Sequence, residues 1–210
     1  MASYERLLTA IQEGNFAGTE SQVRALLDQG LSPKEIIEKG IIVALDIVGK
    51  KFSEGECYIP EMLVSAKASQ RGLEIVKPLL VQSGFTPKGK IVLGTVKGDL
   101  HDIGKNIVAM MLGGAGFQVI DLGYDVAPEK FVETLKAEKA PVLALSCLIT
   151  TTMISMKNTM DALKEAGMFG KVKVMIGGPP TTEDFAKKIG ADFRGKDAYD
   201  AVERARAFVS

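Results

Sequence analysis

The most constraining feature of this sequence is a change in its hydrophobic pattern near Lys90. After that residue, five short runs rich in β-branched residues alternate with amphipathic helical stretches. Such alternation is typical of a parallel sheet with right-handed crossover connections, and five repeats fit the flavodoxin-like (Rossmann-like) strand order 2-1-3-4-5. The predicted strands are 91–96, 118–122, 142–146, 172–176 and a short one near 191–193, and the predicted helices are 104–115, 128–139, 152–166, 181–189 and 197–208.

Before this change the sequence has helical patterns only. Four helices are predicted: one over Tyr4–Ile11 ending at Gly14, one over 19–29, one beginning at Pro33, and one from about Pro60 to Gln82. Four helices with short connections form a small bundle. The stretch 84–90 contains two glycines, a proline and two lysines, which is typical of a linker. We therefore expect a helical bundle over 1–84, a linker over 85–90 and an α/β domain over 91–210.

Composition removes several classes of function. The 26 basic residues balance the 26 acidic ones, so nucleic acid is not expected as the main partner. Two cysteines ninety positions apart form no disulfide framework and indicate a reducing cytoplasm. We expect no signal peptide and no membrane span. The only histidine is His101, so this chain cannot build a multi-histidine metal site.

Three loops of the predicted sheet converge on one edge. Ligands of such sheets bind outside the carboxyl ends of the strands, at the switch point between strands 1 and 3. The loop 97–104 holds His101 between two aspartates, the loop 146–152 is rich in small hydroxyl side chains, and the loop 177–181 begins with a glycine pair. Glycine lets a ligand approach the backbone closely. The sequence therefore predicts a ligand site at this edge.

Other ligand sites fit this edge poorly. A phosphate-binding P-loop needs G-x4-G-K-[ST], whereas five residues separate Gly98 from Gly104 and Asn106 stands at the Ser/Thr position. A phospho-receiver domain would carry an aspartate at the end of strand 3, where this chain has Ser146-Cys147. A zinc site lacks ligands unless a partner contributes them. The glycine-rich stretch 113–116 follows a helix, so it is interpreted as a helix stop.

The loop motifs resemble those of cobalamin-binding proteins. Asp99-x-His101-x-x-Gly104 matches their D-x-H-x-x-G motif, Ser146-Cys147-Leu148 resembles their S-x-L, and Gly177-Gly178 resembles their G-G. Upstream, 52–55 and 58–62 resemble the cap helix pair of methylcobalamin proteins. Nearly the whole chain therefore resembles the corrinoid proteins of multi-component methyltransferase systems and the cobalamin module of methionine synthase.

This resemblance implies a base-off/His-on cofactor, in which a protein histidine replaces the cofactor's own base below cobalt. It makes His101 the axial cobalt ligand, Asp99 the acceptor of its second N–H, and Thr152 the last member of this relay, where methionine synthase has a serine. Gly104 would leave room for the nucleotide tail, Ser146 and Thr150 would bind the buried base, and the glycine pair would line the tail's slot. The implied cofactor-binding residues are Gly98, Asp99, Leu100, His101, Asp102, Ile103, Gly104, Ser146, Leu148, Thr150, Gly177 and Gly178, with Phe52, Tyr58, Ile59 and Met62 as an apolar cap.

Each assignment has a purely structural alternative. Asp102 fits a helix N-cap better than a relay member, and one of the threonines 150–152 is expected to cap a helix. Gly177-Gly178 before two prolines is also typical of a turn. The four cap residues are equally well explained as bundle core, and Cys57 and Cys147 as small packing residues.

The resemblance implies a methyl carrier with cobalamin as methylcobalamin and cob(I)alamin. Its expected partners are a substrate-specific methyltransferase, a second methyltransferase acting on tetrahydrofolate or coenzyme M, and a reductive activator. Methanol, methylamines and methoxylated aromatics are the donor classes, and the chain would be a corrinoid subunit rather than an autonomous enzyme. The alternatives are the B12 subunit of an adenosylcobalamin-dependent mutase, which generally lacks a helical cap, and a B12-dependent sensor, which usually carries a DNA-binding domain.

Overall fold

A computed structural model describes residues 4–82 and 87–209 of the protein. The chain divides into two units, each of which is described by itself. The first comprises residues 1–87 with 110–116, and the second comprises residues 88–109 with 117–210. The predicted linker 85–90 begins with Phe85 and Thr86, which lie outside the described residues, and its last residue, Lys90, already belongs to the first strand.

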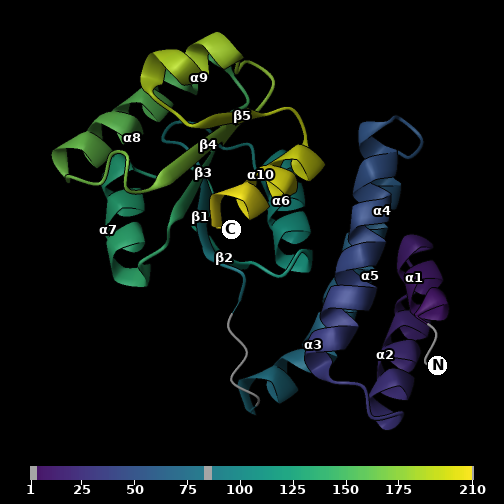
Figure 1. Cartoon of the computed structure of the whole chain (residues 1–210). Coiled ribbons are helices and arrows are strands. Elements are labelled where there is room, and N and C mark those ends of the chain that lie inside the picture. Colours follow the sequence, from purple (N-terminus) through teal and green to yellow (C-terminus); the bar gives the residue numbers. More distant parts are fainter. Residues whose placement is uncertain (1–3, 83–86, 210) are drawn as a thin grey trace. The chain divides into compact units, whose positions relative to one another are not determined.

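The second unit is built on one five-stranded parallel sheet (Figure 1). Its strands are β1 (Lys90–Thr95), β2 (Gln118–Asp121), β3 (Val142–Ser146), β4 (Lys173–Gly177) and β5 (Phe193–Gly195). They follow the order β2-β1-β3-β4-β5, which confirms the predicted flavodoxin-like topology. The switch point therefore falls between β1 and β3, where the predicted site was placed.

Helices cover both faces of this sheet (Figure 1). They are α6 (Ile103–Gly114), α7 (Pro128–Glu138), α8 (Met153–Glu165), α9 (Glu183–Ile189) and α10 (Ala198–Val209). Under α7, α8 and α9 the core packs alternate strand residues such as Val92, Leu143 and Ile176 against Phe131 and Met160. Because strand side chains alternate between faces, the intervening residues serve the face that α6 and α10 cover.

The fifth strand begins two residues later than predicted. Gly190 adopts a left-handed conformation and ends α9, and the amide of Ala191 donates a hydrogen bond to the carbonyl of Ala186. Ala191 is thereby part of the helix cap, so pairing with β4 starts only at Phe193.

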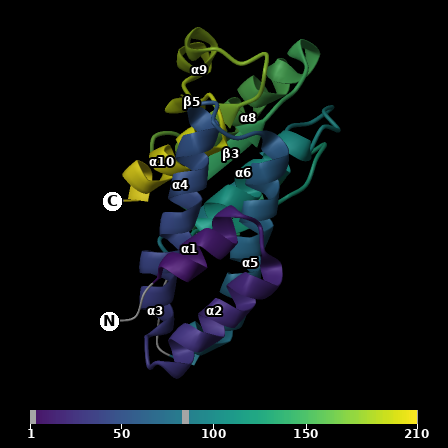
Figure 2. The ribbon, with the colours of Figure 1, turned by 90° about the vertical axis from the view of Figure 1, so that its right-hand side faces the viewer.

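The first unit contains the predicted helical bundle. Its elements are α1 (Glu5–Gln12), α2 (Phe16–Asp28), α3 (Pro33–Ile36), η1 (Ile37–Ile41), α4 (Ile42–Ser53) and α5 (Ile59–Gln82). Helices α1 and α2 form a hairpin that packs on α4 and α5 (Figure 2). The third predicted helix starts at Pro33 with a capping box between Ser32 and Glu35, and it runs on through η1 and α4.

The third helix contains one turn of π-helix, η1. Two isoleucine pairs, Ile36-Ile37 and Ile41-Ile42, are spaced five residues apart, and all four side chains are buried. An α-helix would turn residues five apart toward different sides, whereas i→i+5 bonding brings them closer to one side. The π-turn thus lets both pairs join the bundle core.

Candidate functional site

The ends of β1, β3 and β4 bring the three predicted loops together. Thr95 pairs with Ser146, and Ser146 pairs with Gly177, so the loops that follow start side by side. The amide of Val96 donates to the carbonyl of Ser146, and the amide of Cys147 donates to that of Gly177. The predicted convergence at the carboxyl edge is therefore present in the structure.

Asp99 is the centre of this edge. Its side chain is 0% exposed and its two carboxylate oxygens accept four hydrogen bonds. One oxygen accepts from the His101 amide at 3.0 Å and lies 2.7 Å from the His101 Nδ1. The other accepts from the Leu148 amide at 2.7 Å and from the Thr152 hydroxyl at 2.8 Å. Asp99 thus binds its own loop and the loop after β3 at once.

These bonds fix the charge of Asp99. Burial on its own would raise the pKa of the carboxyl, because a charged group loses its hydration. The hydrogen bonds from the Leu148 and His101 amides, the imidazole and the Thr152 hydroxyl outweigh burial and hold the pKa well below its usual range. Asp99 is therefore an anion at neutral pH and can accept a hydrogen bond from the Nδ1–H of His101.

His101 has one nitrogen engaged and one available. Because Nδ1 lies beside an ionised carboxylate, we assign the imidazole proton to that nitrogen, which leaves the Nε2 lone pair for another partner. The side chain is 52% exposed, so Nε2 is open to a ligand. A neutral imidazole held in this tautomer is suited to binding a metal ion.

Thr152 completes the chain of contacts that begins at His101. It ends the short 3-10 helix η2 (Thr150–Thr152) and is buried. Its hydroxyl oxygen also lies 2.9 Å from the carbonyl of Ile149. Because a hydroxyl has one proton and a carboxylate is the stronger acceptor, we assign the proton to the bond with Asp99. The distances give the order His101, Asp99, Thr152 that the resemblance implies.

Cys147 adds a contact that sequence reasoning missed. Its Sγ lies 3.2 Å from the Thr152 hydroxyl and 3.1 Å from the carbonyl of Ile149. Burial raises the pKa of the Cys147 thiol, so the thiol stays protonated and donates a hydrogen bond to the carbonyl of Ile149. Its place next to Ser146 was the only signal in the sequence, and it did not distinguish a packing role from a polar one.

A buried lysine anchors the helix behind the histidine loop. Lys105, in the first turn of α6, is 2% exposed and pairs with Asp121 at the end of β2. Its ammonium also donates to the side chain of Asn106 at 2.6 Å. Asn106 in turn binds Asp102, which directly precedes α6, in keeping with the alternative interpretation of Asp102 as part of the helix start. Sequence reasoning did not single out Lys105 or Asp121.

The remaining predicted residues of the α/β unit differ in exposure. Apolar side chains stand exposed on the histidine loop, at the start of α6 and after β3: Leu100, Ile103 (75% exposed) and Leu148. Thr150 is exposed and Ser146 is half-buried. Gly98 adopts a positive φ of 86°.

The three glycines expected around the nucleotide tail differ in the space that they leave. A Cβ at Gly104 would meet nothing within 4 Å, and one at Gly177 would meet only a backbone oxygen at 3.8 Å. A Cβ at Gly178 would lie 1.7 Å from the carbonyl oxygen of Cys147. The fold itself therefore requires glycine at 178 but leaves open space at 104 and 177.

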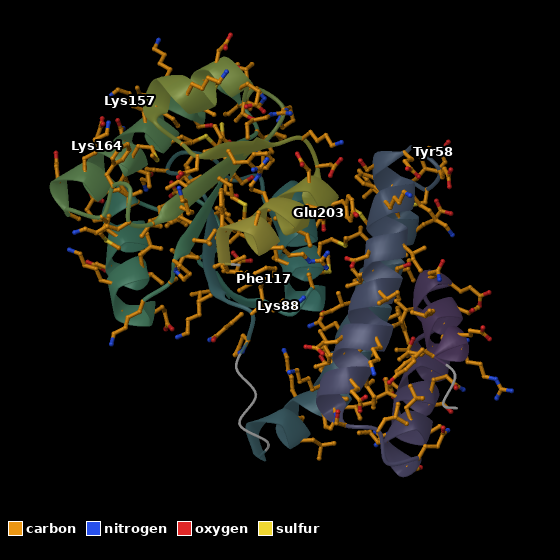
Figure 3. All side chains as sticks on the ribbon, viewed as in Figure 1. Tyr58, Lys88, Phe117, Lys157, Lys164 and Glu203 are labelled. Atoms are coloured by element: carbon orange, nitrogen blue, oxygen red, sulfur yellow. The ribbon has the colours of Figure 1, made fainter. Side chains whose placement is uncertain are left out.

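The four predicted cap residues lie in the helical unit. Tyr58 is at the turn that joins α4 to α5 (Figure 3) and is 73% exposed. Ile59 is also exposed, Phe52 is half-buried and Met62 is buried. Tyr58 and Ile59 are too exposed to belong to the bundle core, so the core interpretation does not fit them. Met62 does not face solvent, so the core interpretation fits it.

The edge of the α/β unit offers groups that could bind a ligand with a metal ion and apolar surface. It offers one available imidazole nitrogen, exposed Leu100, Ile103 and Leu148, and open space beside Gly104 and Gly177. Within the described residues, no group of three or more His, Cys, Asp or Glu side chains is placed to hold a metal ion. No described helix is long and apolar enough to cross a membrane.

Comparisons with known proteins agree on one family. Residues 89–203 match the family described as B12 binding domain, and residues 3–77 match a second family of the same description. Trimethylamine corrinoid protein 1 of Methanosarcina mazei is 45% identical over 183 residues, which cover 86% of this chain and 85% of that protein.

Two solved structures are similar over nearly the whole chain. A cobalamin-binding protein from Desulfitobacterium hafniense is 31% identical, with a TM-score of 0.84 and full coverage of both chains. The methanol:cobalamin methyltransferase complex MtaBC from Methanosarcina barkeri contains a chain that is 32% identical, with a TM-score of 0.86 over 98% of this chain and 79% of that one.

Proposed function

The chain belongs to the family of B12-binding corrinoid proteins, with cobalamin as its cofactor, and we propose that it is a methyl carrier that works with partner methyltransferases. The observation that carries this proposal is the pair of His101 and Asp99, with Nε2 available at the edge where the sheet takes its ligand. When bound, cobalamin supplies a cobalt centre that can accept and release a methyl group.

In this proposal the protein binds cobalamin base-off with His101 on cobalt. Asp99 accepts the Nδ1 proton, which fixes the tautomer and makes Nε2 a better donor to the metal. The Thr152 hydroxyl and the Leu148 amide hold the far oxygen of Asp99, so the carboxylate cannot turn away. Ser146 and Thr150 bind the displaced base, and the space beside Gly104 and Gly177 admits the nucleotide tail.

The carrier needs partners because these residues recognise the cofactor and not a methyl donor. The names of similar proteins mention trimethylamine and methanol, so we propose a methylamine or methanol as donor, with methoxylated aromatics as a further class. A substrate-specific methyltransferase would load the methyl group. A second methyltransferase would pass it to tetrahydrofolate or coenzyme M, and a reductive activator would restore the cofactor. The cap role of Phe52, Tyr58, Ile59 and Met62 stays a prediction.

Reconstitution tests this function directly. The full chain is loaded with cobalamin, reduced, and incubated with each donor and the methyltransferases encoded by its source, while the visible spectrum reports methylation. We expect methylation with one donor class only, and loss of it in His101→Ala. The control is Asp161→Ala, which removes an exposed carboxylate of α8 outside the predicted site. Failure to bind cobalamin, or rearrangement of a mutase substrate by the adenosyl form, would overturn the proposal.

A further inference from the structure

Asp125 has an unusual backbone conformation on the same edge. It lies in the loop between β2 and α7 with a φ of +54°, in the left-handed region that side chains rarely adopt. Lys139 is the other non-glycine residue with positive φ in the described chain, and it caps the end of α7. Asp125 caps no helix, so its conformation calls for a different explanation.

The contacts of Asp125 supply that explanation, because they surround Asp99. One carboxylate oxygen accepts from the amide of Gly98 at 2.8 Å, on one side of Asp99. The amide of Asp125 itself donates to the carbonyl of Asp99 at 3.0 Å, on the other side. The second carboxylate oxygen accepts from the Lys97 ammonium at 3.1 Å. The left-handed turn lets the side chain and the backbone of one residue hold both ends of the Gly98-Asp99 segment.

This arrangement continues the pairing between the two loops. Val96 forms a parallel bridge with Val126, and the amide of Val126 donates to the carbonyl of Thr95 at 3.0 Å. The loop after β1 is thus held on one side by 123–126 and on the other by the Leu148 amide, which donates to Asp99. Among residues 123–126, Asp125 is the one whose charged side chain binds the backbone of the loop after β1.

We propose that Asp125 is a positioning residue: it sets the backbone of Asp99, and through Asp99 it orients the imidazole of His101 for cobalt. This inference rests on the proposed function, since it concerns how the histidine is presented to the cofactor. The carboxylate stays ionised because the Gly98 amide, followed by the Lys97 ammonium, lowers the pKa of Asp125. The pair with Lys97 is exposed and stabilises the fold little, so variants at 125 are expected to fold.

Three variants separate the side chain from the backbone strain. Asp125→Gly removes the carboxylate and tolerates the left-handed turn. Asp125→Asn keeps one oxygen for the Gly98 amide and also tolerates that turn. Lys139→Gly is the matched control, because it relieves a φ of +51° far along the chain at the end of α7. If strain relief alone mattered, both glycine variants would behave alike.

The readout is the electron paramagnetic resonance spectrum of the full chain loaded with cobalamin in the Co(II) state. The protein is labelled with ¹⁵N-histidine, so that imidazole on cobalt splits the lines into doublets whereas the ¹⁴N of the cofactor's own base would give triplets, and the spectrum reports the ratio of His-on to His-off protein. We expect Asp125→Gly to lower this ratio about tenfold, as loss of one charge-assisted hydrogen bond would, with Asp125→Asn in between and Lys139→Gly unchanged. An unchanged ratio in Asp125→Gly would overturn the inference.

A second measurement uses the apoprotein. Since His101 is the only histidine, its ring nitrogens give one pair of ¹⁵N resonances, which report the tautomer. We expect the wild-type and Lys139→Gly proteins to show the Nδ1–H form, and Asp125→Gly to show a mixture. If wild-type protein shows no imidazole splitting with cobalamin, the proposed function fails. The effect of Asp125 on the His101 tautomer in the apoprotein then tests the positioning role separately. The same tautomer in every variant would contradict the inference.

Discussion

The two regions that carry the predicted site residues are built in different ways. At the edge of the α/β unit, Asp99 is fully buried and four hydrogen bonds hold it between two loops. At the turn between α4 and α5, Tyr58 and Ile59 are exposed, and the amide of Tyr58 bonds the side chain of Glu61. The first region owes its geometry to the fold of its own unit, whereas the second displays apolar groups that its bundle core does not use.

The difference separates two kinds of evidence for function. Buried polar groups are costly unless they are paired, so a paired one in a loop is a strong sign that its exact placement matters. An exposed apolar side chain costs the fold little and carries less information by itself. We therefore expect substitution of the buried Asp99 to change both stability and cofactor binding, and substitutions at the turn to change binding only.

The largest expected effect belongs to Asp99→Ala. It leaves the Leu148 and His101 amides and the Thr152 hydroxyl without their acceptor in a buried place, and we expect unfolding to become easier by about 3–5 kcal/mol. Urea unfolding followed by circular dichroism measures this change. Tyr58→Ala is the control from the other region, with an expected change within about 0.5 kcal/mol. Equal effects at the two positions would remove the contrast between the regions.

The glycine pair provides the next effect. Gly178→Ala puts a Cβ 1.7 Å from a backbone carbonyl at a φ of +121°, so we expect a loss of about 2–4 kcal/mol in the free energy of unfolding. Gly177→Ala meets ordinary contact distances and is expected to stay within about 0.5 kcal/mol. Its effect should instead appear as weaker cobalamin binding by titration. Normal cobalamin binding by Gly177→Ala would remove Gly177 from the slot for the nucleotide tail.

Lowering the pH tests the charge of Asp99 without altering its side chain in any other way. Because the pKa of Asp99 is lowered in the folded state, its charge contributes stability above its unfolded pKa of about 4, and that contribution is lost as the pH falls toward the lower folded value. We expect the stability advantage of wild type over Asp99→Asn to be constant from pH 7 to about pH 5 and to shrink below about pH 4. Urea unfolding at a series of pH values measures it, and an advantage that grows in acid would contradict the assignment.

The sequence predicted most of the fold because hydrophobic periodicity and loop residues agree along it. The strand order followed from the alternation after Lys90, and the site from three loops at one edge. It assigned Gly178 to the slot for the nucleotide tail but did not indicate that a Cβ there would meet the carbonyl of Cys147. That contact depends on the spacing of β3 and β4, which no local pattern encodes.

Residues that act through long-range pairing were the ones missed. Asp125 is 26 positions from Asp99, and the loop between β2 and α7 carried no motif that would link the two. Lys105 is sixteen positions from Asp121, and the sequence around the start of α6 does not indicate this partner. Each contact joins a segment that follows β1 to a residue at or just after the end of β2, so both become visible only once the sheet is assembled.

Gly104→Ala tests binding with little effect on stability. A Cβ there meets nothing within 4 Å, and alanine is the better helix former, so unfolding should become harder by about 0.5 kcal/mol. Gly113→Ala is a matched control in the same helix, also with open space around a Cβ. If the nucleotide tail passes Gly104, only Gly104→Ala weakens cobalamin binding in a titration. Equal affinities for the two variants would mean that the tail does not pass there.

The smallest effect on stability is expected at the turn between α4 and α5. A large effect there would contradict the contrast with the edge of the α/β unit. Ile59→Ser and Tyr58→Phe should each change the free energy of unfolding by less than about 0.5 kcal/mol, because both side chains are exposed. If these residues shield the cofactor from water, Ile59→Ser should speed the loss of the methyl group from the loaded protein in light, whereas Tyr58→Phe should slow it, as followed by visible absorbance. Phe16→Ser, an exposed apolar position of the same unit outside the predicted cap, is the control. Matching rates for Ile59→Ser and Phe16→Ser would assign the exposed turn to contacts other than the cofactor.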